Sequence, residues 1–86
     1  MSVYTINKIL YLLENDAAFR EQIKANPHGT IKDFPLTDTE LQALTSGDVG
    51  KLFQMGVHAF LLNGLSRHEL FGVNRDNYLP RIRGEQ

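Results

Sequence analysis

The chain has 86 residues, a formal net charge of −1 and no cysteine, with 42% hydrophobic and 22% charged residues. This length suits one small domain, and the composition is that of a globular protein rather than a disordered segment. The absence of cysteine excludes disulfides, thiolate metal ligands and a thiol nucleophile. The charge is nearly balanced, and Lys and Arg are scattered until the tail, so we expect no nucleic-acid partner.

The N-terminal segment and the apolar runs predict where the protein resides. The first ten residues, MSVYTINKIL, lack the basic start and the small-residue cleavage site of a signal peptide. Apolar runs stay well short of the roughly 18–20 residues that a membrane span needs. We therefore expect a cytoplasmic protein that does not enter a membrane.

Two helices are predicted in the first third of the chain. The first begins between residues 3 and 5 and ends near Glu14, because apolar residues recur at helical spacing: Ile6, Ile9, Leu10 and Leu13. Asn15-Asp16 breaks this helix and caps a second one over residues 17–25. The segment Asn26-Pro27-His28-Gly29 is turn-forming and ends the second helix, and residues 30–35 are expected to be irregular.

The middle of the chain carries the clearest helix-start signals. Thr37-Asp38-Thr39-Glu40 is a capping box, and it predicts a helix that Ser46-Gly47 ends. Asp48 is expected to cap the next helix, with three inward residues: Val49, Leu52 and Phe53. Gly56 is either the C-terminal cap of that helix or a point of close packing between helices.

Two further helices complete the prediction. An apolar helix is expected from Val57 to Phe71, ended by Gly72, with an inward stripe formed by Val57, Phe60, Leu61 and Leu65. A last short helix is expected over Arg75–Leu79, with Asn74 as its cap and Pro80 after it. The prediction is therefore a single compact all-α domain of five to six short helices, comprising residues 1–79, with a polar C-terminal tail at residues 80–86.

The sequence offers no convincing catalytic or metal-binding constellation. His58 and His68 are ten residues apart, about 15 Å along a helix, whereas a helical metal pair needs a spacing of three or four. His28 lies in the predicted turn. The chain has neither the Gly-x-Ser-x-Gly motif of a serine nucleophile nor a phosphate-binding glycine loop. We expect no metal site, no catalytic residue and no cofactor in this chain.

Two surfaces have both a structural and a functional interpretation. On the first helix, polar and aromatic residues share a second face: Tyr4, Asn7, Lys8 and Tyr11. They are either half-buried tyrosines with hydroxyls in water or an aromatic contact face. In the predicted helix over residues 57–71, apolar residues exceed one stripe, so this helix is central to the domain or covered by a partner.

Short motifs recur in a fixed order along most of the chain: Tyr4-x-Ile6-Asn7, Phe19, Phe34-x-Leu36-Thr37, Asp48, Gly56-x-His58-x-Phe60-Leu61, Gly72 and Arg75-Asp76-x-Tyr78. In this order the chain resembles the small (α) subunit family of protocatechuate 4,5-dioxygenase-type enzymes, the class III extradiol ring-cleavage dioxygenases. The resemblance implies an all-helical, non-catalytic small subunit in a hetero-oligomer with a larger catalytic (β) subunit. That partner would hold Fe(II) through two histidines and a glutamate, and would cleave catechol-type substrates with dioxygen.

In this family the small subunit covers the mouth of the partner's active site and helps to shape the substrate pocket. We therefore expect seven residues of this chain to face the partner or the pocket: Tyr4, Asn7, Tyr11, His58, Phe60, Leu70 and Phe71.

The chain departs from the family pattern in its length. It is shorter than the protocatechuate small subunits and compact over residues 65–72, and it looks more like small subunits that act on bulkier catechols, such as aminobiphenyl-diols. An alternative is a stand-alone recognition domain, similar to the leader-like domain of backbone N-methylated peptide precursors. The final residues, VNRDNYLPRIRGEQ, contain no obvious apolar core peptide, which ranks this alternative second.

Overall fold

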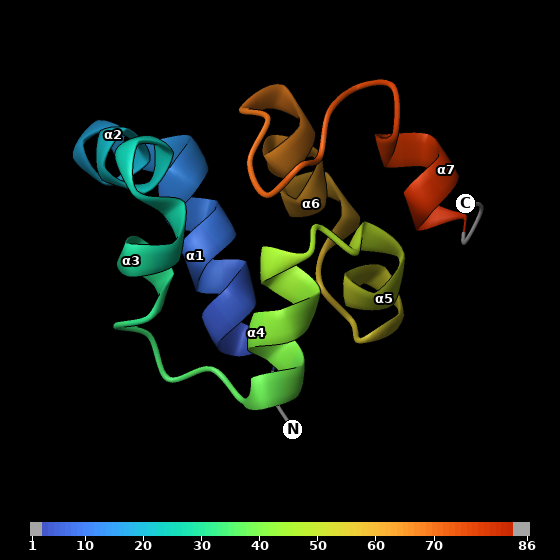
Figure 1. Ribbon diagram of the computed structural model, residues 1–86, viewed down its shortest axis with the longest axis horizontal. Helices are drawn as coiled ribbons and strands as arrows, with labels where there is room; N and C mark the ends of the chain where they lie inside the picture. The colour runs from blue at the N-terminus through green and yellow to red at the C-terminus, as the bar shows by residue number, and fades with distance from the viewer. Residues whose placement is uncertain (1–2, 84–86) are drawn as a thin grey trace.

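The computed structural model describes residues 3–83, and α-helices are the only regular secondary structure in this range. Seven helices follow one another in this range (Figure 1): α1 (Tyr4–Asn15), α2 (Ala17–Ala25), α3 (Pro27–Ile31), α4 (Asp38–Thr45), α5 (Val49–Gln54), α6 (Ala59–Arg67) and α7 (Tyr78–Ile82). The all-α prediction is confirmed, and α3 is the additional helix that the sequence pattern did not predict.

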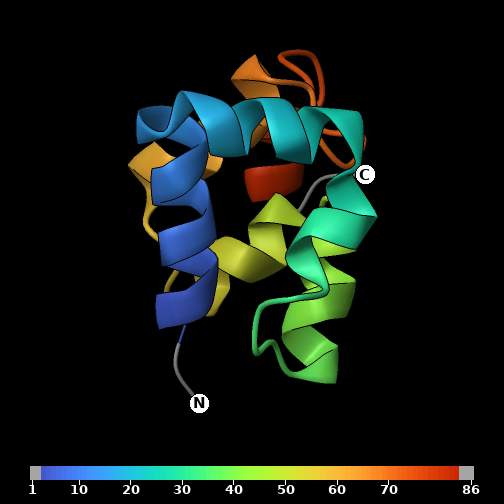
Figure 2. The same ribbon diagram turned by 90° about the vertical axis from the view of Figure 1, so that its left-hand side faces the viewer.

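Helix α2 lies across the end of α1 and links it to α3 on the opposite side of the domain (Figure 2). In Figure 2, α1 stands on one side, α2 crosses over its C-terminal end, and α3 and α4 lie on the other side. Helix α1 packs against α2 and α6, and α5 packs against α4 and α7. This arrangement places α6 beside α1, so that residues far apart in the sequence meet at one surface.

The hydrophobic core is aliphatic throughout the described residues. Ile6, Ile9, Leu10 and Leu13 of α1 are each at most 1% exposed, as the stripe predicted. They join apolar side chains from every helix up to α6 and from the segment after it: Ile23, Ile31, Ala43, Leu44, Val49, Leu52, Val57, Leu62, Leu65, Leu70 and Val73. Phenylalanine and tyrosine side chains lie around this core or on the surface, and four of them pack against it: Phe19, Phe34, Phe71 and Tyr78.

The predicted helix caps are present. The Asp16 carboxylate accepts the Phe19 N–H at 3.1 Å and the Asp48 carboxylate accepts the Lys51 N–H at 3.1 Å. At α4 both hydrogen bonds of the capping box form between Thr37 and Glu40. Each cap satisfies an amide group that the first helical turn would otherwise leave without a partner.

Helix α3 begins where the sequence predicts a turn. The Asn26 side chain accepts the Gly29 N–H at 3.2 Å, and Pro27 occupies the first helical position. Proline has no N–H to lose there and its fixed φ suits a helix start. The same residues therefore serve a turn and a helix start, which explains why the sequence prediction stopped at the turn.

Two residues expected to point inward are exposed. Phe60 is 66% exposed, because α6 begins only at Ala59 and its inward positions are Leu62 and Leu65. Gly56, with φ +106°, reverses the chain direction before α6, so a stripe counted from Val57 starts outside the helix. Phe53 is 49% exposed, because Leu52 takes the inward position of the short helix α5.

Gly56 has the role of a C-terminal cap rather than a packing point. It follows Met55, the last residue of the α5 turn, in the left-handed conformation that favours glycine. A Cβ atom at Gly56 would meet only Val3 Cγ2, at an ordinary 3.8 Å. Backbone conformation, not crowding, therefore requires glycine here.

The chain after α6 differs from the predicted continuous helix. Helix α6 ends at Arg67, and Glu69, Phe71 and Gly72 all have positive φ, which turns Leu70 into the core at 4% exposure. The final helix runs over Tyr78–Ile82 rather than residues 75–79.

The Asn74 carboxamide caps a turn before α7, where it accepts the N–H groups of Asp76 and Asn77. Pro80 is the third residue of α7, where its missing N–H would have no partner within the helix. Ile82 packs on the core, so α7 crosses the domain boundary expected at residue 79. Residues 84–86 of the expected tail lie outside the described residues.

Candidate interaction surface

The outward face of α1 exposes two large aromatic side chains. Tyr4 is 68% exposed and Tyr11 is 56% exposed, with Asn7 and Lys8 between them on the same face. This is the face that helical spacing predicted. Its position opposite the aliphatic stripe means that the core is complete without these tyrosines.

A hydrogen bond joins this face to the start of α6. The Asn7 side-chain oxygen accepts the His58 backbone N–H at 3.1 Å, a contact between residues 51 apart in the sequence. His58 in turn caps α6, because its Nδ1 accepts the Phe60 N–H at 3.2 Å. The structure therefore brings together five of the seven expected contact residues: Tyr4, Asn7, Tyr11, His58 and Phe60.

Two adjoining hollows lie along the junction of α1 and α6. The first, of about 430 Å³, is lined by Tyr4, Asn7, Lys8, Tyr11, Leu12 and Leu61. The second, of about 470 Å³, is lined by Tyr11, Glu14, Asn15, His58, Phe60 and Leu61. Tyr11 and Leu61 line both, so the hollows form one continuous surface, which we call the α1–α6 face.

Leu12 and Leu61 were not among the expected contact residues. Leu61 belonged to the stripe predicted to point into the core, and its half-buried position at the edge of α6 places it between core and surface. Leu12 precedes the buried Leu13 and is half-buried in the same way. An amphipathic pattern separates inside from outside, but it does not identify the residues at the boundary.

A carboxylate holds α1 and α6 together at one end of this face. Glu14 Oε1 lies 2.6 Å from the Arg67 guanidinium and 3.6 Å from His68 Nε2. A Cβ atom at Gly64 would lie 2.6 Å from Glu14 Oε1, so the carboxylate keeps this position only while residue 64 is glycine. The Glu14 side chain is 19% exposed, which limits its screening by solvent.

Burial sets the protonation of the histidine beside Glu14. Desolvation lowers the pKa of His68 below its usual 6.5 and outweighs the attraction of Glu14, which raises it. Lys24, Arg20 and Arg67 lower the pKa of His68 further. At neutral pH the contact with Glu14 is therefore that of a neutral imidazole, and Arg67 is the charged partner of the carboxylate.

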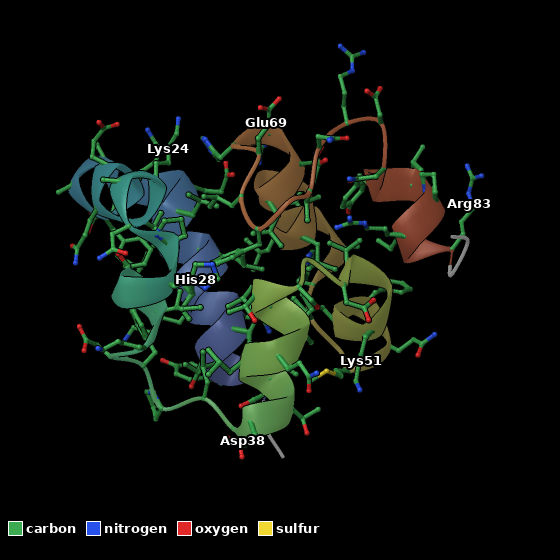
Figure 3. The ribbon with its side chains drawn as sticks, in the orientation of Figure 1. Lys24, His28, Asp38, Lys51, Glu69 and Arg83 are labelled. Atoms are coloured by element: carbon green, nitrogen blue, oxygen red, sulfur yellow. The ribbon has the colours of Figure 1, made fainter. Side chains whose placement is uncertain are left out.

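The two remaining expected contact residues lie outside the α1–α6 face. Leu70 is part of the core. Phe71 is half-buried, and its ring meets the His28 ring edge-on, with centroids 5.5 Å apart. Figure 3 shows His28 directed from α3 toward the middle of the molecule. The turn after α6 thus docks onto α3 rather than extending the face.

Residues 3–83 carry no sign of a metal site or of a membrane span. In this range no three His, Asp or Glu side chains gather in a way that could hold a metal ion. The helices of this range are also too short or too polar to cross a membrane. The α1–α6 face is thus the place where the expected functional residues converge.

A family model described as the LigA subunit of the aromatic-ring-opening dioxygenase LigAB matches residues 6–85. No curated protein and no solved structure gave a significant match. The matched range includes all of α2 to α7 and all but the first two residues of α1, so both helices of the α1–α6 face lie within it. The chain therefore belongs to the LigA family, the small subunits of aromatic-ring-opening dioxygenases.

Proposed function

We propose that this chain is the non-catalytic small subunit of an extradiol dioxygenase and docks on a larger, iron-bearing subunit through the α1–α6 face. The observation that carries the proposal is the exposure of Tyr4, Tyr11 and Phe60 around two joined hollows. Membership of a family of dioxygenase subunits supports the choice of partner.

The chemistry of the face suits a protein partner. Tyrosine and phenylalanine are enriched in the buried centres of interfaces, because each supplies a large apolar area with few rotatable bonds. Tyr11 lies where the two hollows meet, and Asn7 and His58 fix the relative position of α1 and α6 beneath it. A pre-organised face of this kind loses little conformational freedom on binding.

In the proposed complex the reacting groups belong to the larger subunit. That subunit holds Fe(II) through two histidines and a glutamate and opens the ring of a catechol-type substrate in the cytoplasm. This chain covers the mouth of the iron site and contributes surface to the substrate pocket. The resemblance to the shorter small subunits of the family favours catechols bulkier than protocatechuate as substrates.

Co-expression with the large-subunit homologue encoded nearest to this gene tests the proposal. We expect the two chains to elute together in size exclusion and to cleave catechols, with an interface of at least about 1,000 Å². The double variant Tyr11→Ser, Phe60→Ser should lose co-elution. The control Phe53→Ser should keep it, because Phe53 is 49% exposed on α5 but lines neither hollow. A large subunit that is equally stable and active alone would contradict the proposal.

A further inference from the structure

The start of α6 is capped by a titratable group. Helices α2, α4 and α5 are capped by oxygen atoms of Asp16, Thr37 and Asp48. Helix α6 is capped by a ring nitrogen, since His58 Nδ1 accepts the Phe60 N–H at 3.2 Å. Of these four capping groups only the imidazole nitrogen loses its ability to accept a hydrogen bond when it gains a proton.

Protonation reverses the chemistry of this cap. Nδ1 accepts a hydrogen bond only in the neutral imidazole, whose proton then lies on Nε2, whereas both nitrogens of the imidazolium are donors. After protonation, Nδ1–H of His58 would face the N–H of Phe60, donor against donor. The positive charge would also lie at the positive end of the helix dipole. Both effects favour departure of the ring from its capping position.

His58 is exposed, so its ring can leave the capping position for solvent. On α1, the titratable residues Glu14 and Tyr11 line the same hollow as His58, and Lys8 lines the neighbouring one. From α7, the Tyr78 hydroxyl donates to the Ala59 carbonyl at 3.3 Å, beside the cap. Glu14 already meets Arg67 and His68 from α6, so its charge is partly compensated.

We infer that His58 is a pH-sensitive cap that controls the first turn of α6 and, with it, the presentation of Phe60 on the α1–α6 face. The neutral ring fixes the turn, and the imidazolium releases the Phe60 N–H and turns into solvent, to which His58 is exposed. The functional meaning of this switch, which is regulation of docking, rests on the function proposed above. The switch itself needs no partner, because His58 and Phe60 both belong to this chain.

The isolated chain, labelled with ¹⁵N, allows a direct test by NMR between pH 7.5 and pH 5.0. After correction for intrinsic exchange, we expect the Phe60 amide to exchange about fivefold faster at the lower pH, the effect of losing a typical cap. Its chemical shift should follow the titration of the His58 ring. His58→Asn, which retains an acceptor at both pH values, should abolish the pH response.

Two further variants keep the test decisive. His58→Ala should show fast Phe60 exchange at both pH values, and His28→Asn should leave the response unchanged because His28 lies on α3. An unchanged Phe60 amide while His58 titrates, or the same response in His58→Asn, would overturn the inference. Because no partner is present, that failure is separate from a failure of the docking proposal, which only co-elution and ring cleavage report.

Discussion

The two faces of α1 differ in residue type and in exposure to solvent. The inner face carries Ile6, Ile9, Leu10 and Leu13, each at most 1% exposed, and the outer face carries Tyr4 and Tyr11, which are 68% and 56% exposed. Burial of the aliphatic face stabilises the fold, whereas the aromatic face gains nothing comparable from folding. The outer face therefore presents exposed aromatic area that a binding partner would bury.

Helix α6 repeats the same division. Leu62 and Leu65 are buried, whereas Phe60 is 66% exposed beside Tyr11 across the second hollow. Between residues 3 and 83 the buried core side chains are aliphatic, and the largest exposed apolar ones are mostly aromatic. Substitutions on the two sides of this division should therefore affect different properties, stability on the inner side and binding on the outer side.

The largest effect on stability is expected from Leu13→Ala. Leu13 is fully buried, and its truncation leaves a cavity that costs about 2–5 kcal/mol, a large fraction of the ~5–15 kcal/mol of a typical domain. Urea unfolding measures the loss. Leu12→Ala, half-buried at the edge of the α1–α6 face, should cost clearly less. Equal losses at the two positions would break the distinction between the faces.

The boundary between the faces is tested by Gly64→Ala. The new Cβ would lie 2.6 Å from Glu14 Oε1 and 3.5 Å from Leu13 Cδ2, so the carboxylate must leave its place beside Arg67. We expect a net loss of at most about 1 kcal/mol in the free energy of unfolding, because Oε1 is the end of a flexible side chain and alanine favours a helix interior over glycine by about 1 kcal/mol. Asn63→Ala, exposed on the same helix, serves as the control and should change stability by less than about 0.5 kcal/mol.

Adding Glu14→Ala to Gly64→Ala makes the cause explicit. If the carboxylate is what the new methyl group displaces, the second substitution should add little further loss, so that the two effects are not additive. Fully additive losses would show that Gly64 is needed for a reason other than the approach of Glu14.

A smaller effect is expected from pH. The pKa of His68 is lower in the folded chain than its usual 6.5, so below about pH 6.5 the unfolded chain binds more protons than the folded chain. The free energy of unfolding therefore decreases as the pH is lowered. This contribution is complete above pH 6.5. In His68→Gln the melting temperature should fall less between pH 7.5 and pH 5.5 than in the unsubstituted chain. The same fall in both proteins would show that the histidine beside Glu14 does not carry this dependence.

Local signals in the sequence predicted much of the fold. The caps at Asp16, Thr37 and Asp48 depend on residues within one helical turn, and all three form. The inward positions of α6 were wrong because the helix starts later than the apolar pattern does. The turn at Gly56 and the cap at His58 determine where α6 begins and therefore which of its residues point inward. Both depend on backbone conformation rather than on hydrophobicity.

The candidate site depends on contacts that no local pattern carries. Tyr4, Asn7 and Tyr11 were predicted as one face and His58 with Phe60 as part of another, but their union rests on the Asn7–His58 hydrogen bond between distant parts of the chain. Leu70 and Phe71 were grouped with His58 because the apolar pattern predicted one continuous helix over residues 57–71, whereas α6 ends at Arg67. The left-handed residues Glu69 and Phe71 turn this segment away from the face.

The variant Tyr11→Ala tests most directly whether the exposed aromatic face serves binding and the buried aliphatic face serves stability. Calorimetric titration against the large subunit, beside urea unfolding of the same variant, reports binding and stability separately. We predict at least a tenfold loss of affinity, as for an aromatic residue at the centre of an interface, with a change in unfolding free energy within about 1 kcal/mol. Unchanged affinity, or a loss of stability as large as that of Leu13→Ala, would contradict the assignment of this face to a partner.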